Sequence, residues 1–204
     1  MSKETGRSPR RHARRTVVIL GIDGAGKTTA AASLLAAERA AGRPAQLLRN
    51  PAGRRRLSRA AARLGIGVAP HWADRFESTV RTLNVLVSQL RAAAFRGTTV
   101  MDRHLHCQQV LRDVRGLPPG RVLPWLVRVL PRPDAVVLLD LPAEAAHARI
   151  SARGEDSESA DYLRAARNAY LRMAGSLDWQ VVDAAGSRSD VLRRVQAAVS
   201  PPPT

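Results

Sequence analysis

Glycines, a lysine and a threonine stand close together near the amino end of the chain, in GIDGAGKT at residues 21–28. This spacing fits G-x-x-x-x-G-K-[ST], a loop whose backbone amides turn inward around phosphates. The lysine of such a loop reaches the β- and γ-phosphates of a nucleoside triphosphate, and its threonine hydroxyl is a ligand for Mg²⁺. The motif therefore predicts a triphosphate site. The residues predicted to bind ATP are Gly21, Asp23, Gly24, Ala25, Gly26, Lys27, Thr28 and Thr29.

Asp102 and Arg103 form a second candidate group, directly after the apolar run Thr98–Met101. In a parallel sheet the carboxyl ends of the strands meet at the ligand crevice. Asp102 would there serve Mg²⁺ or orient an acceptor, and Arg103 would neutralise charge on a transferring phosphoryl group. A surface ion pair is the alternative for these two residues, and Asp140, which ends VVLLD, is an alternative metal-binding carboxylate. We favour Asp102 because Arg103 follows it directly.

Arginines also lie at a predicted helix end, in RISARGE at residues 149–155, which the polar stretch DSESA follows. A helix that runs into a mobile, arginine-bearing loop is typical of small kinases that close over ATP and exclude water. We therefore expect a lid at about residues 150–160. A solvent-facing helix end, whose arginines complement the helix dipole, fits the same spacing.

The elements that must position these groups alternate between apolar runs and amphipathic segments. Strands are predicted over residues 16–20, 45–49, 98–101, 135–141 and 179–182. Helices are predicted over residues 28–41, 53–67, 73–95, 143–153, 161–174 and 189–199. Strands separated by helices build βαβ units, in which helices cover both faces of a parallel sheet. The pattern predicts a single α/β domain over residues 16–199.

Composition and charge bear on whether the protein binds nucleic acid or a membrane. The 204 residues carry a formal net charge of +16 and are 45% hydrophobic but only 3% aromatic. Positive charge attracts nucleotides, nucleic acids or acidic membranes without selecting among them. The scarcity of aromatic residues argues against a base-stacking surface for nucleic acid. No apolar run approaches the length that spans a membrane, so we expect no membrane partner.

The two ends of the chain and its cysteine content give further expectations. Residues 1–15 hold six basic residues and almost no apolar ones, which predicts a disordered basic tail. Residues 200–204 are expected to be a frayed carboxyl terminus. The single cysteine, Cys107, excludes an internal disulfide and suits a reducing cytosol. We therefore predict a cytoplasmic location.

Taken in order, these motifs resemble the thymidylate kinase family of nucleoside monophosphate kinases. The resemblance implies a three-layer P-loop kinase fold, with a five-stranded parallel sheet flanked by helices. It implies an enzyme of nucleotide biosynthesis that uses ATP and Mg²⁺ to phosphorylate a nucleoside monophosphate, with dTMP as the first candidate. It also suggests a homodimer formed through the long helices. The matching segments are GIDGAGKTT, RNPAG at 49–53, the helix with Arg81, DRH at 102–104, PDAVVLLDLP, ARISARGE, YLRMA at 170–174 and VVDA.

The resemblance further implies roles for individual residues. In the catalytic set, Lys27 stabilises the transferring charge and Arg153 is the arginine of the lid, because the phosphate loop has no arginine of its own. Thr28 and Asp102 are the implied metal ligands. The implied catalytic residues are Lys27, Asp102, Arg103 and Arg153. The implied acceptor-binding residues are Asp23, Arg49, Arg81 and Arg103.

Alternatives stay open on the acceptor side of this predicted site. Arg75 is an alternative to Arg81, for which an ion pair with Glu77 one helical turn away is also an explanation. The family usually has an aromatic residue where Glu77 stands. It usually has glutamate where Asn50 stands and a second glycine where Ala52 stands.

The segment LHCQQV at residues 105–110 lacks the tyrosine of a Tyr–Gln pair that usually holds thymine, although Gln108 or Gln109 offers an amide. A kinase for a different nucleotide or a specialised metabolite is therefore the first alternative function. An ATP-binding regulator without efficient acceptor chemistry is the second. A nucleic-acid-dependent ATPase is a third, and it rests on the charge alone.

Overall fold

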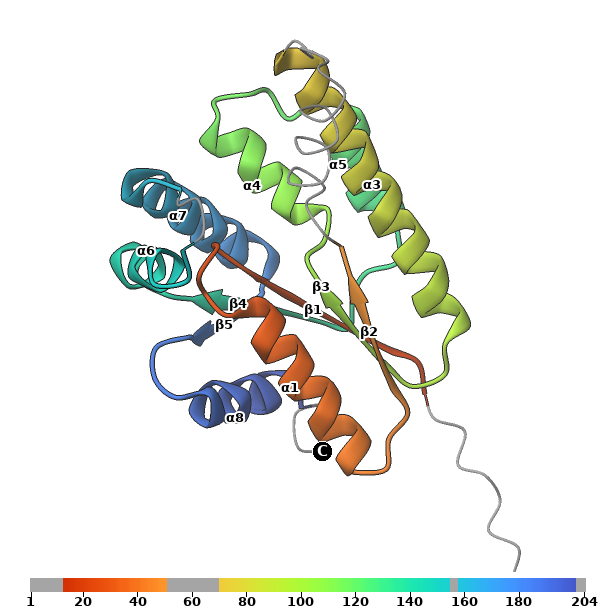
Figure 1. Cartoon of the computed structure of the whole chain (residues 1–204). Helices are drawn as coiled ribbons and strands as arrows, with labels where there is room; N and C mark the ends of the chain where they lie inside the picture. The colour runs from red at the N-terminus through yellow and green to blue at the C-terminus, as the bar shows by residue number, and fades with distance from the viewer. Residues whose placement is uncertain (1–12, 51–69, 155–157, 201–204) are drawn as a thin grey trace, which may run out of the picture.

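The computed structural model describes residues 13–50, 70–154 and 158–200, with the exception of the side chains of residues 70–78 and Arg81. Its described part contains one five-stranded sheet in the order β2-β3-β1-β4-β5, in which all neighbouring strands are parallel (Figure 1). The predicted fold class is therefore confirmed. The strands are β1 (Arg15–Gly21), β2 (Ala45–Arg49), β3 (Thr98–Asp102), β4 (Ala135–Asp140) and β5 (Gln180–Asp183).

Helices cover both faces of the sheet (Figure 1). On one face lie α1 (Lys27–Ala40) and α8 (Arg188–Val199), which pack against each other. On the other face lie α3 (Pro70–Ala94), α4 (His106–Val114), α5 (Val122–Val129) and α7 (Ala160–Leu177), with α6 (Ala143–Ser151) packed on α7. Together with the sheet, these helices make three layers.

Two of these helices, α4 and α5, fall in a part of the chain for which the sequence predicted no element. Prolines at 118, 119, 124, 131 and 133 make the segment around α5 look like a loop, whereas α4 itself contains no proline. Pro124 lies in the first turn of α5, where a helix tolerates proline because no backbone N–H is needed there. The helix predicted over residues 53–67 lies outside the described residues.

The aliphatic core holds the central strand, β1, with Val17, Val18, Ile19 and Leu20 fully buried. The pairing of β1 with its two neighbours sets the edge at which chemistry can occur. Ile19 aligns with Asp102 on one side, and Gly21 aligns with Leu139 on the other. The phosphate loop, Asp102 and Asp140 therefore all lie at the carboxyl edge of the sheet.

The element ends differ slightly from the predicted boundaries. β1 begins at Arg15, one residue before the predicted start of the domain, and Arg15 pairs with Thr98 of β3. Residues 1–12 of the predicted tail and residues 201–204 lie outside the described residues. In the predicted lid, α6 ends at Ser151 and α7 begins at Ala160, and residues 155–157 are not described. No described helix combines the length and apolarity needed to cross a membrane.

Candidate active site

The loop between β1 and α1 leaves an open cradle in front of a helix N-terminus. Gly24 has a φ of 84°, and a Cβ there would lie 2.6 Å from the carbonyl oxygen of Ala146 in α6, so a larger residue does not fit. Gly26, with a φ of 90°, directly precedes α1, and nothing lies within 4 Å of the position that its Cβ would take. The first backbone N–H groups of an α-helix have no partner within the helix, so the start of α1 favours an anion. The loop can therefore hold phosphate.

The side chain of Lys27 contacts residues of the phosphate loop itself. Its ammonium donates to the carbonyl oxygen of Ile22 at 2.7 Å and lies 3.1 Å from Asp23 Oδ1. Only 7% of the residue is exposed. Burial lowers the pKa of Lys27, an effect that Asp23 opposes and the positive charge of Arg103 reinforces. Phosphate oxygens in the cradle would offer the ammonium further negative charge.

Thr28 and Asp102 are in direct contact, although 74 positions separate them in sequence. The Thr28 hydroxyl donates to Asp102 Oδ2 at 2.8 Å. The other oxygen, Asp102 Oδ1, is buried and has no hydrogen-bond partner among the residues that the structure describes. A hydroxyl beside a carboxylate with one unused oxygen is a ligand set that hard divalent cations such as Mg²⁺ prefer. The residues therefore fit the metal that the sequence predicts.

Asp140, the alternative carboxylate, is engaged elsewhere. Arg167 of α7 donates to both of its oxygens, through Nε at 2.6 Å and Nη2 at 2.8 Å. This bidentate pair fastens α7 to the end of β4. Asp102 is thus the strand-end carboxylate that keeps an oxygen available beside the phosphate loop.

Arg103 turns back toward the loop from the end of β3. Its φ of 77° lies in the left-handed region, and its Nη2 donates to Asp23 Oδ1 at 2.9 Å. Asp23 Oδ1 is therefore shared with Lys27. Burial works to lower the pKa of Arg103, but Asp23 and weaker acidic neighbours raise it overall. Two cations that share one carboxylate oxygen retain positive charge for an incoming phosphate.

The remaining predicted acceptor residues come from β2 and α3. Arg49 ends β2, is exposed, and aligns with Asp102 in the sheet, so it lies at the same edge. Arg81 lies in α3 and so does Arg75, but both of their side chains fall outside the described residues. The choice between these two arginines therefore stays a prediction.

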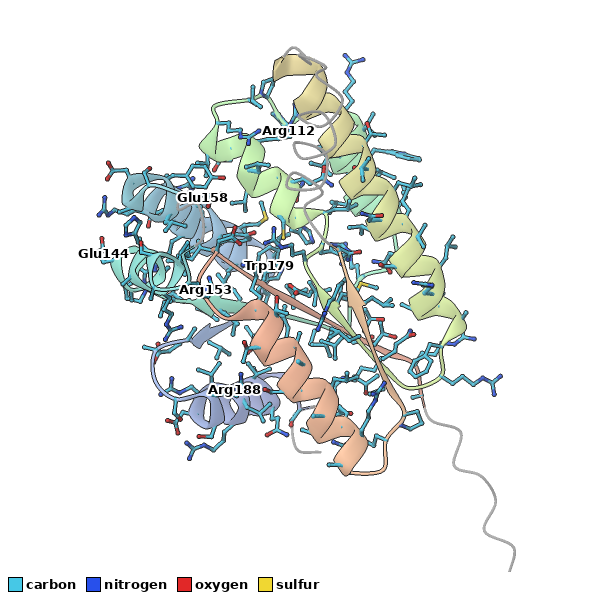
Figure 2. The ribbon with its side chains drawn as sticks, in the orientation of Figure 1. Arg112, Glu144, Arg153, Glu158, Trp179 and Arg188 are labelled. Carbon is cyan, nitrogen blue, oxygen red and sulfur yellow. The ribbon has the colours of Figure 1, made fainter. Side chains whose placement is uncertain are left out.

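A cavity of about 410 Å³ lies beside the loop, between α6 and α8. Gly24, Gly26 and Thr29 line one side, and Arg149 and Arg153 of the α6 end line another. Arg188, the first residue of α8, also lines it (Figure 2). Planar guanidinium groups stack on aromatic rings and attract phosphate. The cavity therefore suits the donor nucleotide.

Arg188 is not among the residues predicted from sequence. It follows the short segment AAGS after β5, and Gly186 there has a φ of 105°. Such a glycine marks a turn after the strand, which is the only local signal that this arginine faces the carboxyl edge. Arg149, in contrast, belongs to the predicted lid motif, and its Nη2 lies 3.4 Å from the carbonyl oxygen of Ala184.

The same residues can be compared with those of known proteins. The family model described as thymidylate kinase matches residues 19–195. The chain belongs to the thymidylate kinase family. A thymidylate kinase of Xanthomonas oryzae pv. oryzae (strain PXO99A) is 34% identical over 195 residues, which cover 90% of this chain and 82% of that protein. A probable thymidylate kinase of Archaeoglobus fulgidus is 28% identical over 185 residues, covering 90% and 93% of the two chains. The resemblance stated from sequence is therefore confirmed.

Gln108 and Gln109, the two candidates for the glutamine of the Tyr–Gln pair, lie in different surroundings. Gln108 is buried, and its amide contacts the Thr82 hydroxyl of α3 at 3.3 and 3.4 Å. Gln109 Oε1 lies 2.9 Å from Nδ1 of His106, one turn earlier in the same helix. The structure therefore brings Gln108 into contact with the helix that carries Arg81.

Proposed function

We propose that this thymidylate kinase family member transfers the γ-phosphoryl group of ATP to the phosphate of dTMP, giving ADP and dTDP. Membership of the family supports the reaction. The observation that carries the proposal is the meeting of the Thr28–Asp102 pair with Arg103 and Lys27 at one sheet edge. Phosphoryl transfer needs positioning and charge neutralisation more than covalent chemistry, so this set of residues suffices.

On the donor side, the triphosphate of ATP would lie in the cradle of residues 21–29. Lys27 would leave the Ile22 carbonyl and Asp23 to reach the transferring phosphoryl group. The nucleoside would occupy the cavity lined by Arg149, Arg153 and Arg188, where a guanidinium can stack on the base. Arg153, at the end of α6, is the residue proposed to close over the phosphates as the lid arginine.

Thr28 and Asp102 would hold Mg²⁺. The unused buried oxygen of Asp102 and the adjacent hydroxyl support this assignment. When bound, the ion neutralises charge on the β- and γ-phosphates. Asp140 is less suited to this role because Arg167 donates to both of its oxygens.

On the acceptor side, Arg49, Arg81 and Arg103 would bind the phosphate of dTMP. Asp23 would lie near the acceptor sugar and phosphate, and it holds Arg103 at 2.9 Å before substrate arrives. Gln108, whose amide offers both a donor and an acceptor, is the candidate for contact with the thymine base. A different nucleotide acceptor is the alternative, because the usual tyrosine and stacking aromatic residue are replaced.

The enzyme is further proposed to form a homodimer through α3 and α5. These helices pack on each other through a cluster that includes Val85, Leu123 and Leu126. Each also presents an exposed apolar stripe at helical spacing, which a partner chain would cover. The stripes consist of Leu83, Val87 and Leu90 on α3 and of Val122, Trp125 and Val129 on α5. A cytoplasmic location stays a prediction from the sequence.

The test is a coupled assay with ATP and Mg²⁺ against dTMP, dUMP, dCMP and UMP. We expect fastest turnover on dTMP, and a loss of about 10²- to 10³-fold in kcat for Lys27→Ala. The chain has one other lysine, Lys3, in the basic tail, and Lys3→Ala is the matched control that should keep full activity.

Each other outcome of this assay contradicts the proposal in a different way. Faster turnover of another monophosphate would move the reaction to that acceptor. ATP binding without any phosphorylated product would instead favour the regulator. Unchanged turnover by Lys27→Ala would remove the phosphate loop from the mechanism.

A further inference from the structure

A buried asparagine lies directly behind the backbone of Asp102 and Arg103. Asn50 follows the last residue of β2 and is 6% exposed. Its side-chain Nδ2 donates to the carbonyl oxygen of Arg103 at 2.9 Å. Its backbone N–H donates to the carbonyl oxygen of Asp102 at 3.2 Å. The Ser88 hydroxyl of α3 donates to Asn50 Oδ1 at 2.8 Å. One side chain thus links β2, the end of β3 and α3.

The backbone that Asn50 contacts is in a strained conformation. Arg103 has a φ of 77°, and a non-glycine residue in the left-handed region costs about 1–3 kcal/mol unless its surroundings hold it there. The Arg103 N–H donates to the carbonyl oxygen of Ile19 at 3.3 Å. The Arg103 carbonyl is held by Asn50 from the other side. Neighbouring strands therefore fix this turn, from which the guanidinium reaches Asp23 across the phosphate loop.

The long helix α3 contacts the same turn through two adjacent buried polar residues. Ser88 bonds to Asn50, and Gln89 Nε2 lies 2.9 Å from Nε2 of His104, the residue after Arg103. Ser88 is 6% exposed and Gln89 is 7% exposed. Polar groups buried this deeply in a helix interface are retained where they form specific contacts. Both sides of Arg103 are therefore tied to the helix that carries Arg81.

We propose that Asn50 is a positioning residue that holds Arg103 for the acceptor phosphate and, through Ser88, keeps it aligned with α3. This inference rests on the proposed function of Arg103. Asparagine suits the position because its amide donates to a carbonyl and accepts from a hydroxyl at the same time. An aspartate at residue 50, with the same side-chain length, would accept from Ser88 but would face the Arg103 carbonyl without a proton to donate. Asn50 acts through Arg103 and does not itself touch the transferring group.

The test is Asn50→Asp, which is nearly isosteric, removes the Nδ2 donor and adds a negative charge. We expect the KM for dTMP to rise at least tenfold while the KM for ATP stays within twofold, because the phosphate loop is untouched. Ser88→Ala keeps the Asn50–Arg103 bond and removes one support, so its KM for dTMP should rise by a smaller factor, about threefold. Asn168→Asp makes the same chemical change on the exposed face of α7 and should leave both constants unchanged.

A second readout needs no substrate. In the free protein, the backbone ¹³C shifts of Arg103 should lose their left-handed signature in Asn50→Asp and keep it in Asn168→Asp. A wild-type enzyme that does not turn over dTMP would refute the proposed function, and these shifts would still test the positioning. The inference is wrong if the shifts of Arg103 are unchanged. It is also wrong if Asn50→Asp lowers kcat and the melting temperature while both KM values stay the same. If Asn50→Asp does not fold, Ser88→Ala decides in the same assays.

Discussion

Two aspartates, Asp102 and Asp140, end the strands on either side of β1, and their surroundings differ. Each follows buried strand residues and lies at the carboxyl edge of the sheet. Asp102 accepts one hydrogen bond from Thr28 and keeps a buried oxygen without a partner in the described part of the chain. Asp140 has both oxygens bound by Arg167. The carboxylate available to a ligand is thus determined by residues far away in sequence.

The two arrangements have opposite effects on the stability of the free protein. A buried polar atom without a partner costs about 1–3 kcal/mol, so Asp102 destabilises the free protein relative to a fully bonded residue. Such a cost is tolerated where a ligand supplies the missing contact. Asp140 and Arg167 instead form a charge-assisted bidentate contact between β4 and α7, which stabilises the fold. We therefore propose that Asp102 serves the reaction and that Asp140 serves the stability of the fold.

Exchanging each carboxylate for an amide should give the largest difference between the two. Asp102→Asn should lower kcat by about 10³-fold, because charge that serves the metal and the transferring phosphoryl group is lost. Asp140→Asn should keep kcat within about threefold and lower the free energy of unfolding by about 1–2 kcal/mol. Initial rates at saturating ATP and dTMP, with urea unfolding of both variants, make the comparison. Equal loss of turnover in the two variants would show that Asp140 also serves the reaction.

Local patterns in the sequence were sufficient to predict the location of Asp102 and of the phosphate loop beside it. The phosphate loop is contiguous, so its spacing alone indicated its glycines, Lys27 and Thr28. The run that ends in Asp102 and Arg103 predicted a strand end at the same edge, and the pairing of β1 with β3 confirms that location. The aliphatic runs of β1 and β4 predicted those two strands, because strands buried on both faces of a parallel sheet are largely apolar.

Contacts between distant segments were not predictable. The bond from Arg167 to Asp140 and the bond from Ser88 to Asn50 join residues 27 and 38 positions apart. A single sequence gives no signal for such pairs, because an arginine or a serine on an amphipathic helix is equally compatible with an exposed position. Arg188 was not identified because its one local signal, the turn glycine Gly186, does not indicate which side chain after the turn reaches the cavity. Helix α5 was missed because prolines flank it and Pro124 lies within it.

Acid should lower the free energy of unfolding through His104, a buried histidine that follows β3. His104 is 4% exposed, and burial, together with the nearby His106, lowers its pKa to about 3. An unfolded histidine takes up a proton near pH 6.5, whereas the folded one stays neutral until about pH 3. The unfolded state therefore binds more protons over this range. Stability is fully present above pH 6.5 and falls by about 1.4 kcal/mol per pH unit below it.

Urea unfolding between pH 7.5 and 5.0 measures this slope. The wild-type protein should lose about 2 kcal/mol from this histidine between pH 6.5 and 5.0. His104→Gln, which keeps a polar side chain beside Gln89, should show a shallower dependence whatever its stability at pH 7.5. Parallel curves for the two proteins would mean that His104 does not control the acid sensitivity. The buried His106 would then be the next residue to change.

The smallest effect concerns the helix that follows the structural carboxylate. After Asp140 the chain enters α6, whose end brings Arg153 to the cavity beside the phosphate loop. Arg153→Ala should raise the KM for ATP about tenfold, equivalent to about 1.4 kcal/mol of binding, because one guanidinium contact to the nucleotide is lost. Arg132→Ala, an exposed arginine before the other end of β4, is the matched control and should leave the KM for ATP unchanged. If both variants keep the wild-type KM for ATP while Arg149→Ala raises it, the arginine that closes the lid is the one held by Ala184. In that case the arginine that binds ATP would be Arg149, which lies within α6, and not Arg153, which lies beyond the end of the helix.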